Sequence, residues 1–69
     1  MEEKHHITLN GERATVLVYS DAPLAPDVLE IVIEREAEYL AQEQFGAGGT
    51  FAAVGPRAFT YAPPAPLPV

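Results

Sequence analysis

The chain has 69 residues, a mass of 7.4 kDa and a formal charge of −6, from ten acidic and four basic side chains. A chain of this length forms one small domain with a core of limited size. It contains no cysteine, which excludes disulfides and thiolate metal sites. Hydrophobic residues make up 48% of the sequence and charged residues 20%, as is typical of globular domains, so we expect residues 1–61 to fold.

The net charge also argues against direct binding of DNA or RNA. Such binding at ordinary salt depends on clustered Lys and Arg side chains, whereas those here are scattered at Lys4, Arg13, Arg35 and Arg57. No segment has the run of about 18 apolar residues that a membrane span needs, and the first residues do not resemble a secretory signal. We therefore expect a cytoplasmic protein with no membrane contact.

Residues 4–20 predict a β-hairpin. Apolar and polar residues alternate before Asn10-Gly11, and β-branched residues follow. Asn and Gly tolerate the positive φ angles of a two-residue type I′ turn, which places Leu9 opposite Glu12. The same register places Ile7 opposite Ala14 and His5 opposite Val16. The face assigned to the core carries Ile7, Leu9, Ala14, Val16 and Val18. The opposite face carries His6, Thr8, Arg13, Thr15, Leu17 and Tyr19.

After a loop over residues 20–25, residues 26–45 predict a helix. Pro26 suits the first turn, Asp27 complements the positive end of the helix dipole, and Gly46 ends the helix. Large apolar side chains recur at spacings of three and four, as in a helix that lies on a sheet. They are Val28, Leu29, Val32, Ile33, Tyr39 and Leu40.

Two short apolar runs follow the glycine-rich residues 46–49. They cover residues 50–54 and 58–61, with a Gly55-Pro56 turn between them, and predict two strands. Residues 62–69 include four prolines and cannot join a sheet interior. The predicted fold class is α+β: a single domain over residues 1–61 in the order β-β-α-β-β, with one helix packed on a face of one sheet, and an extended Pro-rich tail over residues 62–69.

The predicted helix carries most of the negative charge. Residues 26–45 hold six acidic side chains against Arg35 alone, which gives −5 of the total −6. Glu30, Glu34 and Glu38 stand at successive i, i+4 positions and form an acidic ridge about 12 Å long. This acidic ridge suits a basic partner. The alternative is a solvated face that keeps the protein soluble.

Four apolar residues are not explained by the predicted core. Ile31 and Phe45 fall on the polar side of the helix, beside the acidic ridge, while Leu17 and Tyr19 lie on the open face of the hairpin. Large apolar groups with a polar rim are typical of protein interfaces. Single exposed apolar residues are also common, and Phe45 has an alternative place under the glycine-rich linker. A second copy or the Pro-rich tail would cover Leu17 and Tyr19.

The sequence predicts no catalytic site, no metal site and no cofactor. His5 and His6 are adjacent, so in a strand they point to opposite faces and cannot bind one metal ion together. Glu36 falls on the apolar stripe of the helix, without a nucleophile or second base in view. The structural alternatives for this carboxylate are an ion pair with Arg13 or Arg57, or a place at the rim of the sheet.

The sequence thus predicts a small acidic, non-enzymatic interaction protein, either an inhibitor or an accessory subunit, that docks on a larger protein with a basic surface. A nucleic-acid mimic of the phage-encoded type is a narrower form of this hypothesis. The predicted partner-binding residues are Glu30, Glu34, Glu38, Ile31, Phe45, Leu17 and Tyr19. The alternative function is a structural, self-assembling subunit that forms a homodimer or larger homo-oligomer through the outer sheet face and the Pro-rich tail.

Overall fold

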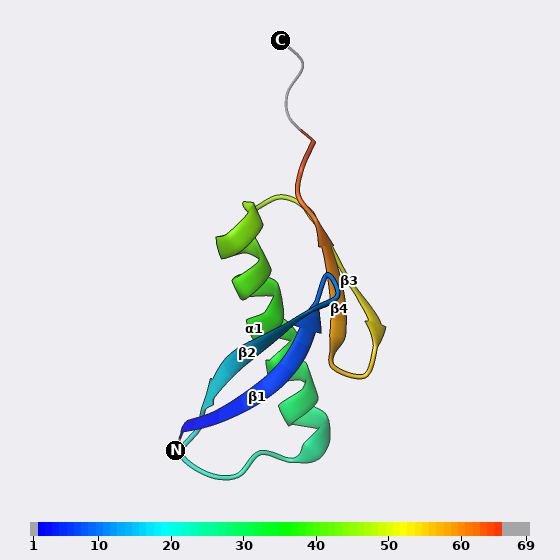
Figure 1. Cartoon of the computed structure of the whole chain (residues 1–69). Helices are drawn as coiled ribbons and strands as arrows, with labels where there is room; N and C mark the ends of the chain where they lie inside the picture. The colour runs from blue at the N-terminus through cyan, green and yellow to red at the C-terminus, as the bar shows by residue number, and fades with distance from the viewer. Residues whose placement is uncertain (1, 66–69) are drawn as a thin grey trace.

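The computed structural model describes residues 2–65, which form two β-hairpins joined by one helix (Figure 1). The elements are β1 (Glu2–Leu9), β2 (Glu12–Tyr19), α1 (Pro26–Phe45), β3 (Thr50–Gly55) and β4 (Ala58–Ala62). All four strands belong to one sheet. The predicted α+β fold with the order β-β-α-β-β is therefore confirmed.

The first hairpin has the predicted register. Asn10 and Gly11 have φ angles of 52° and 79°, positive at both central positions as a type I′ turn requires. Leu9 pairs with Glu12, and the ladder continues to the pair of Glu2 and Tyr19. β1 therefore begins slightly before the predicted hairpin.

The two hairpins meet in a short parallel seam at the centre of the sheet, whose strand order is β2-β1-β4-β3. Thr8 lies beside Ala58 and Leu9 beside Phe59. The backbone N–H of Thr8 donates to the carbonyl of Arg57 at 2.9 Å. We call this contact the β1–β4 seam, and it leaves β2 and β3 as the two outer strands.

The side chain of Asn10 extends the β1–β4 seam by one step. Its Nδ2 donates to the carbonyl of Tyr61 at 3.1 Å, and the N–H of Tyr61 donates to its Oδ1 at 2.8 Å. The N–H of Asn10 itself donates to the carbonyl of Phe59 at 2.9 Å. A primary amide offers one donor and one acceptor side by side, as a peptide group does. Asn10 therefore continues the ladder where β1 has already turned away.

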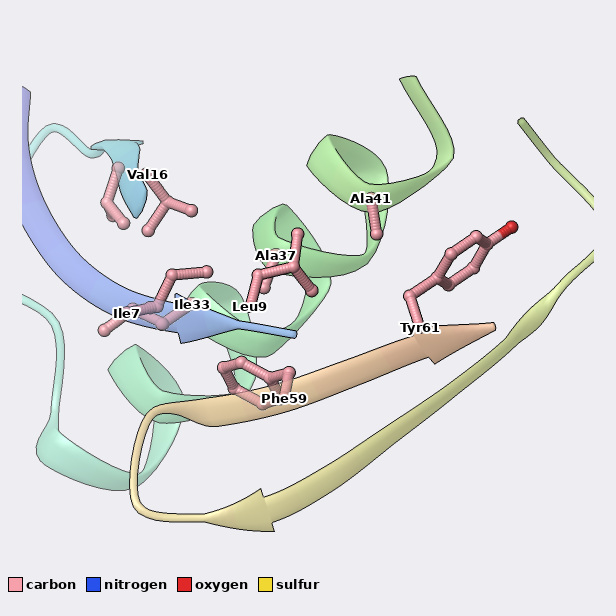
Figure 2. Packing of buried hydrophobic residues seen from close by; sticks show 9 residues of the cluster. Ile7, Leu9, Val16, Ile33, Ala37, Ala41, Phe59 and Tyr61 are labelled. Carbon is pink, nitrogen blue, oxygen red and sulfur yellow. The ribbon is translucent and has the colours of Figure 1, made fainter. Parts of the chain in front are cut away.

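The helix α1 covers one face of the sheet and encloses the core (Figure 2). The buried residues are Ile7, Leu9, Val16, Val18, Ile33, Ala37, Ala41, Phe59 and Tyr61. The predicted apolar stripe of the helix is wrong in part, because Val28 and Tyr39 are exposed while Ala37 and Ala41 are fully buried. The small alanine side chains let the helix backbone approach the sheet closely, and a prediction based on large side chains misses them.

Tyr61 ties the end of the helix to β4. Its hydroxyl donates to the carbonyl of Gly46 and accepts from the N–H of Gly49 at 2.9 Å. Its ring stacks on Phe45, with ring centroids 6.2 Å apart. A side chain at Gly49 would collide with the carbonyl oxygen of Ala62 and with the Tyr61 ring. The glycine-rich linker is thus held in place by one tyrosine.

The second hairpin differs from the prediction in its turn. Gly55 is the last residue of β3, so Pro56 and Arg57 occupy the turn instead of Gly55-Pro56. Arg57 has a φ angle of 52°, which is uncommon for a residue other than glycine. Residues 63–65 follow β4 outside any strand or helix, and the remaining tail, residues 66–69, lies outside the described residues.

Replacing Asn10 tests the extension of the β1–β4 seam. Glycine adopts the positive φ angle of this position without strain, so Asn10→Gly removes the two side-chain hydrogen bonds to Tyr61 and keeps the turn. Because the backbone groups of Tyr61 lose their partners, we expect the free energy of unfolding to fall by about 1–3 kcal/mol in urea denaturation. Gly11→Asn is the control for the turn alone: its side chain meets open space, and asparagine tolerates the φ angle of 79° better than most residues, so we expect a smaller loss. An equal loss in both variants would contradict this role for Asn10.

Replacing Gly49 tests the close approach of the linker to β4. In Gly49→Ala the new methyl group meets backbone that cannot move without breaking contacts of Tyr61, so we expect a loss of about 3 kcal/mol in thermal unfolding. In the matched variant Gly55→Ala, the methyl group lies 3.7 Å from the Ala58 Cβ, an ordinary contact distance. Gly55→Ala should therefore unfold close to the wild-type temperature, and similar behaviour of the two variants would refute the packing described.

Candidate interaction surfaces

The acidic ridge lies on the surface of α1. Glu30, Glu34 and Glu38 are all exposed, one helical turn apart on the same side of the helix. Within residues 2–65, neither Glu34 nor Glu38 has an ion-pair partner. These two carboxylates therefore face solvent with their charge uncompensated by a direct contact.

Glu30 differs from the other two members of the ridge, because it is paired. Arg57 donates to its Oε1 through Nε at 3.2 Å and through Nη2 at 2.9 Å. Arg57 lies in the turn between β3 and β4, so this pair joins the second hairpin to the N-terminal half of α1. Both side chains remain partly exposed, so the pair is screened by solvent. The uncompensated part of the ridge is its C-terminal half.

The two apolar residues predicted beside the ridge have different surroundings. Ile31 is 58% exposed and stands three residues before Glu34, on the neighbouring turn of the helix. Phe45 is 42% exposed, but one face of its ring stacks on Tyr61 at the end of the core. Phe45 thus takes the alternative place near the glycine-rich linker, and Ile31 is the apolar residue available beside the ridge.

The other two predicted residues, Leu17 and Tyr19, lie at the opposite edge of the molecule. They are 37% and 68% exposed on the outer strand β2. They line a hollow of about 280 Å³ between β2 and α1, which we call the β2 groove. Its other lining residues are Thr15, Val16, Glu36, Tyr39, Leu40 and Glu43. The structure therefore separates the seven predicted residues into two surfaces, on either side of the helix.

Glu36 belongs to the β2 groove. It is partly buried on the wall formed by α1, as in the alternative that placed it at the rim of the sheet. It makes no ion pair with Arg13 or Arg57, since Arg57 is engaged by Glu30. The periodicity of the sequence does not show that Glu36, Tyr39 and Leu17 line one groove, because this depends on how the helix crosses the sheet.

The two histidines lie on opposite faces of β1. His5 Nε2 lies 3.2 Å from Glu3 Oε2, and His6 Nδ1 lies 3.2 Å from Thr15 Oγ1. Among residues 2–65, no three His, Asp or Glu side chains are grouped so that they could hold a metal ion. The described part of the chain also contains no helix that combines the length and apolar character needed to cross a bilayer.

Comparisons with protein-family models, with curated proteins and with solved structures found no match to this chain. Two surfaces of the molecule are candidates for an interaction. One is the exposed acidic ridge with Ile31, and the other is the β2 groove.

Neighbouring isoleucines of α1 test the assignment of Ile31 to the surface. Ile33 is 0% exposed, so Ile33→Ala should lower the free energy of unfolding by about 2–5 kcal/mol. Ile31→Ala should change it by less than about 0.5 kcal/mol, because its side chain mostly faces water. Urea denaturation of both variants measures the difference. Comparable losses would mean that Ile31 belongs to the core.

Proposed function

We propose that this chain is a small non-enzymatic interaction protein, an inhibitor or accessory subunit, that docks on a larger protein with a basic surface. The observation that carries this proposal is the exposed acidic ridge with the uncompensated charges of Glu34 and Glu38. Ile31 beside it supplies an apolar contact within a charged surround, the usual anatomy of an interface. The lack of cysteine fits action in the reducing cytoplasm.

The charge of the ridge sets the chemistry of the partner. Carboxylates spaced by one helical turn attract Lys and Arg side chains, and this attraction both steers the encounter and weakens with salt. A groove that binds nucleic acid on a partner protein is lined by Lys and Arg side chains. Mimicry of a nucleic-acid backbone is therefore the narrower form of the proposal. The proposal includes no direct contact between this chain and nucleic acid, because the acidic ridge repels phosphate.

A second candidate function, self-assembly, has support from the outer strand β3. The carbonyl of Phe59 faces β1, so by alternation along the ladder Ala52 faces β4 and the backbone groups of Phe51 and Ala53 point to the open edge. Residues 44–56 carry no charge. An uncharged open strand pairs readily with a second copy of itself. Light scattering distinguishes this candidate, because such a homo-oligomer persists at high salt.

Charge reversal on the ridge tests the main proposal. The immobilised chain is exposed to a lysate of the source organism, and any captured protein is then purified and its affinity measured at about 0.05 M and about 0.5 M salt. We expect Glu34→Lys combined with Glu38→Lys to weaken binding at least about tenfold, because two attractive contacts become repulsive. Glu2→Lys combined with Asp21→Lys changes the net charge equally at exposed sites outside α1, and should bind almost normally.

Three outcomes would contradict the proposal. The captured protein could bind the ridge variant as well as the wild type, or bind equally at both salt concentrations, or lose affinity to the same degree in both double variants. The last outcome would show that only the net charge of the chain matters. Ile31→Asp adds a further check, because it should weaken the same interaction while leaving the fold intact.

A further inference from the structure

The outer edge of β2 presents unpaired backbone groups. Thr8 and Asn10 direct their backbone N–H groups to β4, so the intervening residue Leu9 directs its own groups to β2. By the same alternation, the β2 residues paired with Leu9, Ile7 and His5 face β1. The alternate residues of β2 direct their N–H and C=O groups to the open edge, and they are Arg13, Thr15, Leu17 and Tyr19.

Three of these residues, Thr15, Leu17 and Tyr19, are also the strand side of the β2 groove. The floor of the groove holds buried Val16 and partly buried Leu40. Tyr19 and Tyr39, 68% and 56% exposed, are the aromatic side chains that line it. An open strand edge beside an apolar floor and a helix is the arrangement in which proteins bind extended peptides as an added strand.

The charges of the groove are all of one sign. Glu36 and Glu43 stand on α1 about 10 Å apart along the helix axis, and no Lys or Arg lines the groove. No ion pair engages either carboxylate within the described residues. A ligand that enters the groove meets two carboxylates, so the charge complement is a segment with Lys or Arg side chains.

We propose that the β2 groove binds an extended basic peptide segment of another protein, which pairs with β2 and sets Lys or Arg side chains against Glu36 and Glu43. In such a strand, every second side chain points to the helix side, about 6.8 Å apart. The aliphatic stems of those side chains cover Leu40 and Tyr39, and their charged ends reach the carboxylates. This surface is separate from the acidic ridge, so the inference goes beyond the proposed function.

Two occupants from this chain itself fit the groove poorly. The Pro-rich residues 62–69 contain no Lys or Arg, and their prolines lack the N–H groups that the strand edge would bind. A second copy that paired through β2 would bring two copies of α1 to the same face of one joined sheet. Each helix carries a charge of −5, so their repulsion opposes that arrangement.

Hydrogen exchange with a defined peptide tests the proposal. The probe is a capped peptide of about ten residues that alternates valine and lysine, and an alternating valine–glutamate peptide is its charge control. Val16 and Val18 already face β1, so their amides are protected without peptide. We expect the valine–lysine peptide to slow exchange at Thr15, Leu17 and Tyr19 by at least about tenfold. The glutamate peptide should leave these three amides unprotected.

Matched variants separate the two acidic surfaces. Glu36→Gln with Glu43→Gln should weaken binding of the valine–lysine peptide by about three- to tenfold at low salt, as expected for two partly exposed charge contacts. Glu34→Gln with Glu38→Gln removes the same charge from the acidic ridge and should leave this affinity unchanged. Methylating the backbone nitrogens of alternate peptide residues gives two variants, one for each set of residues. Only the variant whose methylated nitrogens face β2 should lose binding, because only those N–H groups pair with the strand.

Several results would overturn the proposal. One is that the valine–lysine peptide does not change exchange at Thr15, Leu17 and Tyr19. The others are that the glutamate peptide binds equally well, or that both pairs of Gln variants weaken binding equally. Protection of the same amides that rises with protein concentration alone would mean that a second copy occupies β2. If the groove proposal fails, the ridge experiment still tests the proposed function, because its variants change Glu34 and Glu38 on the other side of the helix.

Discussion

The β1–β4 seam is the contact on which the sheet depends. Each hairpin forms from residues that are neighbours in the chain, so nothing local joins the two hairpins. The parallel register covers only two residue pairs, and Asn10 lengthens it by binding both backbone groups of Tyr61. A domain of this size has a small core, so a few ordered hydrogen bonds are a large share of what holds it together. The position of α1 over the seam closes the core from one side.

The seam also decides which surfaces remain open. By placing β1 and β4 at the centre, it leaves β2 and β3 with one unpaired edge each. The two edges differ in character, because β3 is uncharged whereas β2 lies beside the carboxylates of Glu36 and Glu43. The acidic ridge occupies the other side of the same helix. The single helix thus separates two acidic surfaces, each with its own apolar neighbours. The Glu30–Arg57 pair neutralises only the start of the ridge.

Local patterns predicted what depends on local physics. The Asn10-Gly11 turn determines the register of the first hairpin, and Pro26 and Gly46 mark the ends of the helix, because turn and helix preferences act over a few residues. Strand order and the Asn10–Tyr61 contact join residues about 50 positions apart, so no local pattern reports them. The buried alanines of α1 were missed because small residues carry little weight in an apolar stripe. The sequence showed that the predicted core does not account for Leu17 and Tyr19. It did not show that Tyr39 and Glu36 line the same groove, because these residues are distant in the chain.

The length of chain between the partners of the seam has a consequence for the order of folding events. Thr8 and Ala58 are separated by about 50 residues, so closing this loop costs more entropy, about 2 kcal/mol, than closing a hairpin turn. Loop entropy therefore favours formation of the hairpins and α1 before the seam. Until the seam closes, the first hairpin has an open edge on β1 as well as on β2. The β4 strand of a neighbouring molecule can pair with β1 during that interval. The step that completes the sheet is thus also the step at which the folding chain is most exposed to domain swapping.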